Sequence, residues 1–404
     1  MTQHLFDRPL SRRTVLGTLA AAGLSACGGG GDGIDSGGTG GAPSSFSHGS
    51  IAGFGSIIVN GVRFDDSHAA IVDDAGTPHA RADLKLGMVV DIEAGPIDGD
   101  NTGERPRGVA RRIEFASEIR GPLQSLDVAA GRFTALGQTV HVDADTVFEA
   151  LPDGLASLHV GQLVEVYGFI DLSSGSYTAT RIERHAAMPA YKLRGPVAGL
   201  DTGARRFTIG ALVIRYDDVQ DPSLDALADG MLLRIELQAT PQRGEWAVRT
   251  ARVRERRIDE GVDATLEGFV RELSAAGTFR LNGITVDVSD PALRFRRGDR
   301  SLIVEGARIT VEGQIDGGVL RARRVHVRRA GGGDEDFELE GRIQAHDRQA
   351  ASFELQGITV TVDARTRFVG GQEADLAVGR RVEVRGVLAG PGERLLATRI
   401  KFDR

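Results

Sequence analysis

Histidine, cysteine and serine are the side chains most able to supply a metal ligand or a nucleophile, and in this sequence they are dispersed. The histidines beyond the N-terminal region are His48, His68, His79, His141, His159, His185, His326 and His346. Their spacing does not place two metal ligands close together on one face. No nucleophile-elbow sequence surrounds a serine. We therefore expect no metal centre, no cofactor and no catalytic residues, and predict that the protein is not an enzyme.

One acidic segment begins like a calcium-binding loop. Asp98 and Asp100 occupy the first and third positions of such a loop, and Gly103 occupies the sixth. The twelfth position, where a glutamate should close the loop, holds Val109 instead. We interpret the segment as an acidic hairpin tip, with calcium binding as the alternative hypothesis.

Arginine is concentrated in residues 264–329, which contain twelve arginines and eight acidic residues. By contrast, residues 51–117 contain eleven acidic residues and seven basic ones. Arg294, Arg296 and Arg297 are the candidates for a polyanion-docking face, because clustered positive charge attracts phosphates and acidic glycans. The alternative, which we favour, is a solvated strand face whose arginines pair with acidic residues on neighbouring strands.

The charge and the scarcity of aromatic residues argue against nucleic acid as a partner. The formal net charge is −7, aromatic residues make up 5% of the chain, and Trp246 is the only tryptophan. Single-stranded nucleic acids are bound by positive grooves and by stacking of bases on aromatic side chains. No apolar run reaches the roughly 18 residues that span a bilayer, so we also expect no transmembrane helix.

The N-terminal residues carry the features of a bacterial export signal. Arg12 and Arg13 precede a short apolar stretch, residues 15–26, which is too short for a transmembrane helix. This stretch leads into Leu24-Ser25-Ala26-Cys27, which resembles a lipobox and implies cleavage before Cys27 and acylation of its sulfur. The paired arginines resemble the twin-arginine motif, without its preferred phenylalanine. We predict a lipoprotein anchored on the periplasmic side of the cell envelope.

The residues after the cysteine predict a flexible tether up to residue 50. They are largely glycine, serine and aspartate, and such a stretch buries too little apolar surface to become ordered. Gly28, rather than aspartate, follows Cys27, which favours the outer membrane over the inner. Because Cys27 is the only cysteine, no internal disulfide is expected, and each domain must be stabilised by its own core.

Four landmarks recur in the same order about every 70–75 residues, which indicates tandem repeats. The first is a strand-like segment with a glycine, at Gly53, Gly121, Gly195, Gly268 and Gly341. The second is Gly-x-x followed by Val or Phe, at Gly61, Gly137, Gly210, Gly283 and Gly357. The third is Gly-x-x-Φ-x-Φ, where Φ is aliphatic, at Gly87, Gly161, Gly230, Gly306 and Gly379. The fourth is arginine followed by Ile or Val, at Arg112, Arg181, Arg252, Arg324 and Arg399.

Within each repeat the dominant period of apolar residues is two, as in Val164-Glu165-Val166-Tyr167. This alternation indicates strands with one buried and one solvated face, here expected to be antiparallel. Asn60-Gly61 and Asn282-Gly283 supply residues that suit hairpin tips. Five or so short strands, with a short helix or loop after the third, predict an all-β fold of small OB-like antiparallel barrels. Small β-sandwiches are the alternative.

These landmarks predict the organisation of the whole chain. Residues 1–26 form the cleaved signal, and residues 27–50 form the lipidated cysteine and its tether. Five β domains are expected, at residues 51–117, 118–188, 189–259, 260–330 and 331–404.

The segment Gly53-Phe54-Gly55-Ser56-Ile57-Ile58-Val59-Asn60-Gly61-Val62-Arg63-Phe64-Asp65, with the later Gly-x-x-Φ-x-Φ and Arg-Ile elements, resembles a bacterial family called domain of unknown function 5666. The resemblance covers nearly all of the chain after the tether. It implies tandem OB-like domains in exported proteins, often lipoproteins, and it brings no catalytic residues.

Two functions are therefore expected, in order of preference. The first is a non-catalytic envelope module that binds a glycan, lipopolysaccharide or another envelope protein while anchored in the membrane through Cys27. The second is a structural spacer made of repeated barrels. An enzyme is the third and is disfavoured.

Overall fold

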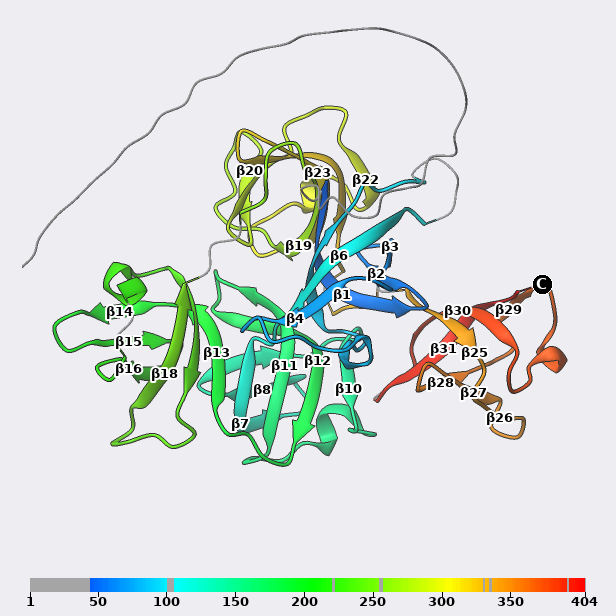
Figure 1. Ribbon diagram of the computed structural model, residues 1–404, viewed down its shortest axis with the longest axis horizontal. Helices are drawn as coiled ribbons and strands as arrows, with labels where there is room; N and C mark the ends of the chain where they lie inside the picture. Colours follow the sequence, from blue (N-terminus) through cyan, green and yellow to red (C-terminus); the bar gives the residue numbers. More distant parts are fainter. Residues whose placement is uncertain are drawn as a thin grey trace, which may run out of the picture. The chain divides into compact units, whose positions relative to one another are not determined.

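The computed structural model describes residues 44–99, 105–219, 222–253, 257–329, 331–333, 336–390 and 392–403. Within these residues the chain forms 31 strands and five short 3-10 helices (Figure 1), so the predicted all-β fold is confirmed. Among the described residues, no helix has the length and apolarity needed to cross a membrane. The predictions for Arg12, Arg13 and Cys27 lie outside the described residues.

The strands fall into five consecutive groups. The first contains β1 (Ser45–Phe54), β2 (Ile57–Val59), β3 (Val62–Asp65), β4 (Ala70–Asp73), η1 (Arg81–Asp83), β5 (Val89–Ala94) and β6 (Arg107–Phe115). The second contains β7 (Ile119–Asp127), β8 (Arg132–Ala135), β9 (Gln138–His141), β10 (Val147–Glu149), η2 (Gly154–Ser157), β11 (Leu163–Asp171) and β12 (Ser176–His185). The third contains β13 (Tyr191–Pro196), β14 (Ala198–Asp201), β15 (Arg206–Ile209), β16 (Leu212–Arg215), η3 (Pro222–Ala226), β17 (Leu232–Leu237) and β18 (Trp246–Val253).

The last two groups repeat the pattern. The fourth contains β19 (Asp263–Phe269), β20 (Thr278–Leu281), β21 (Ile284–Asp287), β22 (Arg294–Arg297), η4 (Arg300–Leu302), β23 (Arg308–Asp316) and β24 (Val319–Val327). The fifth contains β25 (Phe337–Arg342), β26 (Ala345–Asp347), β27 (Ser352–Leu355), β28 (Ile358–Thr361), β29 (Arg367–Val369), η5 (Glu373–Asp375), β30 (Arg381–Leu388) and β31 (Arg394–Phe402).

One pairing order closes each group into a small barrel. In the first group β1 pairs with β2, β2 with β3, β3 in parallel with β6, β6 with β5, and β5 with β1 again. The five main strands therefore follow the order 1-2-3-5-4-1, with a 3-10 helix before the fourth, as in an OB barrel. The second group closes in the same way, through β7, β8, β9, β12 and β11. The predicted OB-like barrels are confirmed.

The first two sequence landmarks are the two sides of one contact inside each barrel. A Cβ atom on Gly121 would lie only 2.6 Å from Cγ of Leu136, which stands at the turn between the second and third strands. The same contact joins Gly49 to Asn60, Gly195 to Ile209, Gly268 to Asn282 and Gly341 to Gln356. In the first group the glycine is thus Gly49, which pairs with Val90 as Gly121 pairs with Val164, and not the predicted Gly53.

The third landmark marks the turn before the fourth main strand. Gly161 has a φ of 91°, and its N–H donates to the carbonyl of Leu123 in the first strand, β7, at 2.8 Å. The equivalent glycines also have positive φ and make the equivalent hydrogen bond: Gly87, Gly230, Gly306 and Gly379. Residues with a Cβ rarely adopt this conformation, which explains why glycine recurs there.

The first strand starts earlier than the sequence predicted. β1 begins at Ser45, whereas the first domain was expected at Ile51 and residues 45–50 were assigned to the tether. Ser45 and Ser47 are fully buried, and this part of β1 pairs in parallel with β19. Backbone pairing therefore orders a segment whose polar composition suggested a flexible chain.

The third group departs from the repeat in its closing strand. Ala251 lies opposite Ile235, the position that Ile182 occupies opposite Val166 in the second group. The predicted landmark Arg252-Val253 is therefore two residues out of register with its counterparts. Among the described residues, this group also has no short strand between β16 and η3.

Pairing between first strands connects the groups. β1 pairs with β19 and with β25, and β7 pairs with β13. The buried apolar residues form three cores rather than five: one shared by the first and fifth groups, one by the second and third, and one in the fourth. The predicted count of five separate domains therefore stays a prediction.

Candidate ligand-binding cavity

Asp74 is a buried carboxylate held between basic side chains. Its side chain, just beyond β4, is 4% exposed and accepts from Lys192 Nζ at 2.8 Å and pairs with Arg234 Nη1 at 2.7 Å. Arg252 Nη1 donates to the Asp74 carbonyl at 2.8 Å. Arg234 and Arg252 lie directly opposite each other on β17 and β18. Because opposed like charges destabilise a sheet, Asp74 stabilises this pair.

A second buried ion pair lies beside it. Arg194 on β13 donates from Nη1 to both carboxylate oxygens of Glu118, at 3.0 and 3.2 Å. Burial on its own would lower the pKa of Arg194, but the charge of Glu118 and its hydrogen bond outweigh burial, so that the pKa is raised. Arg194 therefore stays a cation, and the pair fixes its orientation.

Asp74, Glu118, Arg194, Arg234 and Arg252 help to line a cavity of about 640 Å³, which is within the size range of small-ligand sites, roughly 300–1,000 Å³. Its wall includes parts of β1, β5, β6, β17 and β18 and of the turn near residue 280. Seven arginines and six acidic residues line it, an excess of one positive charge when His48 is neutral. Phe46, Ile170, Met231 and Phe269 add apolar surface. The lining therefore suits an anionic ligand with apolar or hydroxylated parts.

Two guanidinium nitrogens at the cavity lack hydrogen-bond acceptors. Nε of Arg234 and Nε of Arg271 are buried, and neither has an acceptor among the described residues. A buried donor without an acceptor costs about 1–3 kcal/mol. Burial has the largest effect on the pKa of Arg234 and lowers it. The charge of Asp74 acts in the opposite direction but does not outweigh burial, so the pKa is lowered. An anionic ligand would supply the missing acceptors and balance the excess charge.

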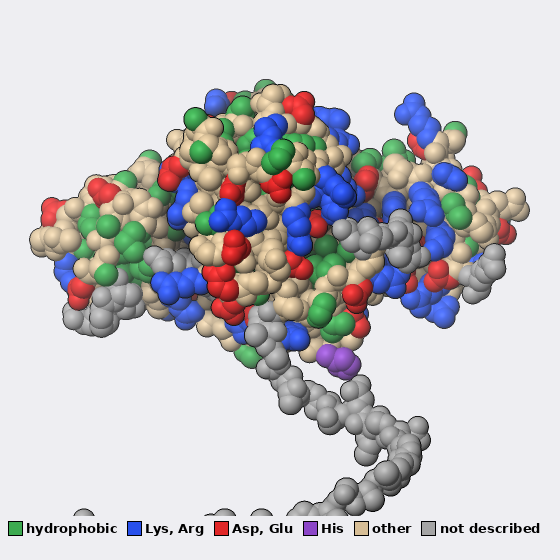
Figure 2. Space-filling model, turned by 90° about the horizontal axis from the view of Figure 1, so that it is seen from above, with side chains coloured by type: hydrophobic (Ala, Val, Ile, Leu, Met, Phe, Trp, Pro, Cys, Tyr) green, Lys and Arg blue, Asp and Glu red, His purple; other side chains and the backbone are tan. Residues whose placement is uncertain are grey.

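The predicted docking residues lie elsewhere. Arg294, Arg296 and Arg297 are exposed on β22, which pairs with β24, and none of them lines the cavity. Nearby arginines pair with acids, as predicted: Arg323 with Asp263 at 2.5 Å and Arg324 with Glu312 at 2.7 Å. Figure 2 shows basic and acidic side chains interspersed on the face that it displays. These pairs fit the favoured prediction of a solvated, ion-paired strand face.

Three further networks bury charge at strand junctions. Glu338 on β25 is fully buried and pairs with Arg63, with Arg105 at 2.8 Å and with Arg385 at 2.8 Å. Glu267 on β19, also fully buried, lies 2.8 Å from Arg308 and 3.2 Å from Arg328.

The pKa of Glu267 shows which effect prevails in its network. Burial would raise this pKa, but the positive charges of Arg328 and Arg308 outweigh it and lower the pKa. The carboxylate therefore stays ionised in the protein interior.

Arg181 on β12 is the centre of the third network. Its side chain is fully buried and pairs with Glu149, with Glu183 at 2.5 Å and with Glu393 at 2.6 Å. Its Nη1 also donates to the carbonyl of Leu86 at 3.0 Å. Burial would lower the pKa of Arg181, but the surrounding carboxylates raise it. Arg181 thereby links residues from the first, second and fifth groups.

One cluster of metal-ligating side chains escaped the sequence analysis. Ligand atoms of Glu165, Glu183 and His185 all lie within 4.8 Å of one another. The prediction of no metal centre rested on spacing between histidines, whereas this cluster combines one histidine with two glutamates. The sequence did contain a signal for it, because Glu183 and His185 are two residues apart on one strand and therefore lie on the same face.

The calcium hypothesis is described only in part. Asp98 and Arg107 exchange backbone hydrogen bonds at 2.8 and 2.7 Å, which fits the base of the predicted hairpin. Residues 100–104 lie outside the described residues, so calcium binding stays a prediction.

The strand order defines the class: a protein built of repeated OB-like barrels. Residues 120–183, 267–326 and 340–401 each match the family described as Domain of unknown function (DUF5666). No curated protein matches the chain. The unmatched first and third groups keep the strand order but differ in detail, through the long connection between β5 and β6 and the shifted closing strand β18.

Proposed function

We propose that the protein is a non-catalytic cell-envelope lipoprotein whose barrels form a binding or adaptor module for an anionic envelope component. The observation that carries the binding role is the arginine-rich cavity, with an excess of one positive charge and with the acceptor-free Nε atoms of Arg234 and Arg271. Acidic glycans and the phosphates of lipopolysaccharide have the chemistry that guanidinium groups bind. Few aromatic residues and a net charge of −7 argue against nucleic acid.

The envelope location rests on the N-terminal sequence. Arg12 and Arg13, the short apolar stretch and Cys27 together favour export and acylation. We expect Cys27→Ser to move the protein from the membrane fraction to the soluble fraction of the cell. Immunoblotting of fractions would measure the shift, with Ser25→Ala, which keeps the cysteine, as the matched control. Membrane retention of Cys27→Ser at the control level would contradict the anchor.

The binding role is tested by screening the full chain, with Cys27→Ser, against acidic glycans, neutral glycans, lipopolysaccharide and vesicles of anionic lipid. We expect saturable binding to an acidic member that weakens between low and physiological salt, because screening reduces interactions with exposed ligand charges. Neutral glycans serve as controls. If the chain binds none of these ligands although its circular dichroism shows folded β-structure, the binding role is contradicted.

A structural spacer is the second candidate, and one observation favours it. β1 pairs with both β19 and β25, and Glu338 ties three arginines together at one of these junctions. Such junctions resist bending between barrels, as a spacer requires. The same array separates the two candidates, because a spacer needs no ligand.

A further inference from the structure

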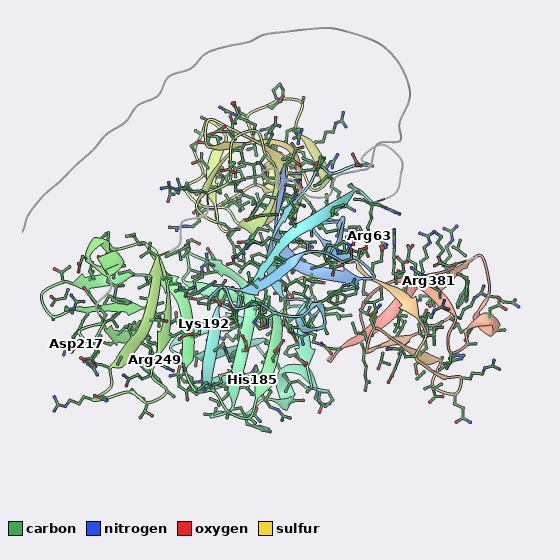
Figure 3. The ribbon with its side chains drawn as sticks, in the orientation of Figure 1. Arg63, His185, Lys192, Asp217, Arg249 and Arg381 are labelled. Carbon is green, nitrogen blue, oxygen red and sulfur yellow. The ribbon has the colours of Figure 1, made fainter. Side chains whose placement is uncertain are left out.

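Two glutamates oppose each other on the long hairpin of the second barrel. Glu165 on β11 and Glu183 on β12 are direct cross-strand partners. Like charges in this arrangement are destabilising unless a positive charge compensates them. His185 follows two residues after Glu183 and therefore lies on the same face of β12. Figure 3 labels His185 on this hairpin.

The geometry directs one oxygen of each carboxylate towards the imidazole. His185 Nε2 lies 3.0 Å from Glu165 Oε2 and 3.7 Å from Glu183 Oε2. The other oxygens have their own donors: Tyr167 donates to Glu165 Oε1 at 3.3 Å, and Arg181 Nε donates to Glu183 Oε1 at 2.5 Å. Donors behind the ligand atoms orient them, as they do around metal ions in proteins.

The surroundings carry an excess of negative charge. Four carboxylates contribute: Glu149, Glu165, Glu183 and Glu393. The two guanidinium groups in contact with them belong to Arg181 and Arg120, with Arg120 Nε 3.4 Å from Glu165 Oε2. With a neutral His185 the excess is two negative charges, which one divalent cation would balance.

The equivalent hairpin of the third barrel also carries a pair of like charges, and there an opposite charge compensates them. Arg234 and Arg252, opposed on β17 and β18, hold the oppositely charged Asp74 against them. Glu165 and Glu183 are opposed in the equivalent hairpin of the second barrel, β11 and β12, and their charges are negative. By this comparison the acidic pair calls for positive charge, and Arg120, Arg181 and a protonated His185 are the groups of the chain that supply it.

We propose that Glu165, Glu183 and His185 form a binding site for a divalent transition metal ion, with Zn²⁺ as the best match. An imidazole nitrogen with two carboxylate oxygens is a donor set that suits Zn²⁺, whereas Ca²⁺ and Mg²⁺ prefer oxygen donors alone. Three protein ligands leave the fourth tetrahedral position to water. The His185 side chain is 30% exposed, so the cluster lies close to the protein surface. On binding, the ion replaces the proton of His185, which leaves to solvent.

The test is a calorimetric titration of the metal-free full chain with zinc chloride. Every sample carries Cys27→Ser, so that no thiol competes for the ion. We expect one saturable site in this chain, and binding at least tenfold weaker in His185→Gln and in Glu183→Gln. Zn²⁺ should also raise the melting temperature, whereas equal concentrations of Mg²⁺ should leave it unchanged.

His159→Gln is the matched control, because His159 is exposed in the same barrel and lies outside the cluster. It should bind Zn²⁺ like the parent chain. If Glu183→Gln fails to fold, the more exposed His185→Gln still decides the question. The proposal is wrong if the parent chain takes up no Zn²⁺, or if His185→Gln takes it up with unchanged affinity. It does not depend on the proposed function.

Discussion

Glu338→Ala is expected to lower the free energy of unfolding by about 3–5 kcal/mol, the typical cost of removing one partner from a buried ion pair. Glu338 is fully buried, and its carboxylate is the shared partner of Arg63, Arg105 and Arg385. Without it, three neighbouring guanidinium groups repel one another in a setting with little water. Arg63 would keep Glu340 and Arg385 would keep Glu383 at 3.5 Å, so the loss falls chiefly on Arg105.

Thermal and urea unfolding, followed by circular dichroism, would measure this change. Because a chain of connected barrels need not unfold in one step, the transition that includes β25 to β31 is the one to compare. Glu354→Ala is the control, since Glu354 is exposed on β27 of the same barrel. Equal melting of the two variants would show that the Glu338 network contributes nothing.

Arg181→Met is expected to have an effect of the same size, about 3–5 kcal/mol. Methionine replaces most of the buried aliphatic volume, so that the change isolates the guanidinium group. Its removal leaves Glu149, Glu183 and Glu393 without their common partner and the Leu86 carbonyl without its donor. The arginine belongs to β12, whereas Leu86 and Glu393 come from other groups, so contacts between groups should loosen as well.

Urea unfolding of Arg181→Met beside Arg184→Met would test this. Arg184 is exposed on the same strand, three residues away, and its replacement should change stability by less than about 0.5 kcal/mol. Limited proteolysis should also cut Arg181→Met faster than the control. Indistinguishable unfolding of the two variants would refute the role assigned to Arg181.

The parts of the fold that the sequence predicts are those set by local chemistry. The glycine before each fourth main strand needs a positive φ, and the first-strand glycine needs room for a turn residue such as Leu136. Both requirements place a glycine at a fixed position in every repeat. Alternating apolar residues then supply the strands. The start of β1 was missed because Ser45 is ordered by pairing with β5 and with β19, and both partners lie far from it along the chain.

The candidate sites were beyond sequence analysis for a related reason. The cavity is lined by residues from four groups, and Arg234 meets Asp74 only once those groups are packed. An overall net charge of −7 conceals a cavity with an excess of positive charge. Glu165 meets Glu183 and His185 through the register of β11 and β12, which no spacing along the chain specifies. Exposed arginines such as Arg294 and Arg296 were easier to notice because they lie within a few residues of one another in the sequence.

The most direct test of the central claim is an equilibrium titration of an acidic glycan or lipopolysaccharide, chosen from the array, into the chain and its Arg271→Met variant. Arg271 lines the cavity, and its Nε has no acceptor among the described residues, so the change removes a ligand contact without breaking a known bond of that atom. Arg249→Met, at an exposed site outside the cavity (Figure 3), is the control. We predict about tenfold weaker binding for Arg271→Met and unchanged binding for Arg249→Met and for the triple variant of Arg294, Arg296 and Arg297. Unchanged binding by Arg271→Met, with loss in the triple variant, would place the ligand on β22 and contradict the account.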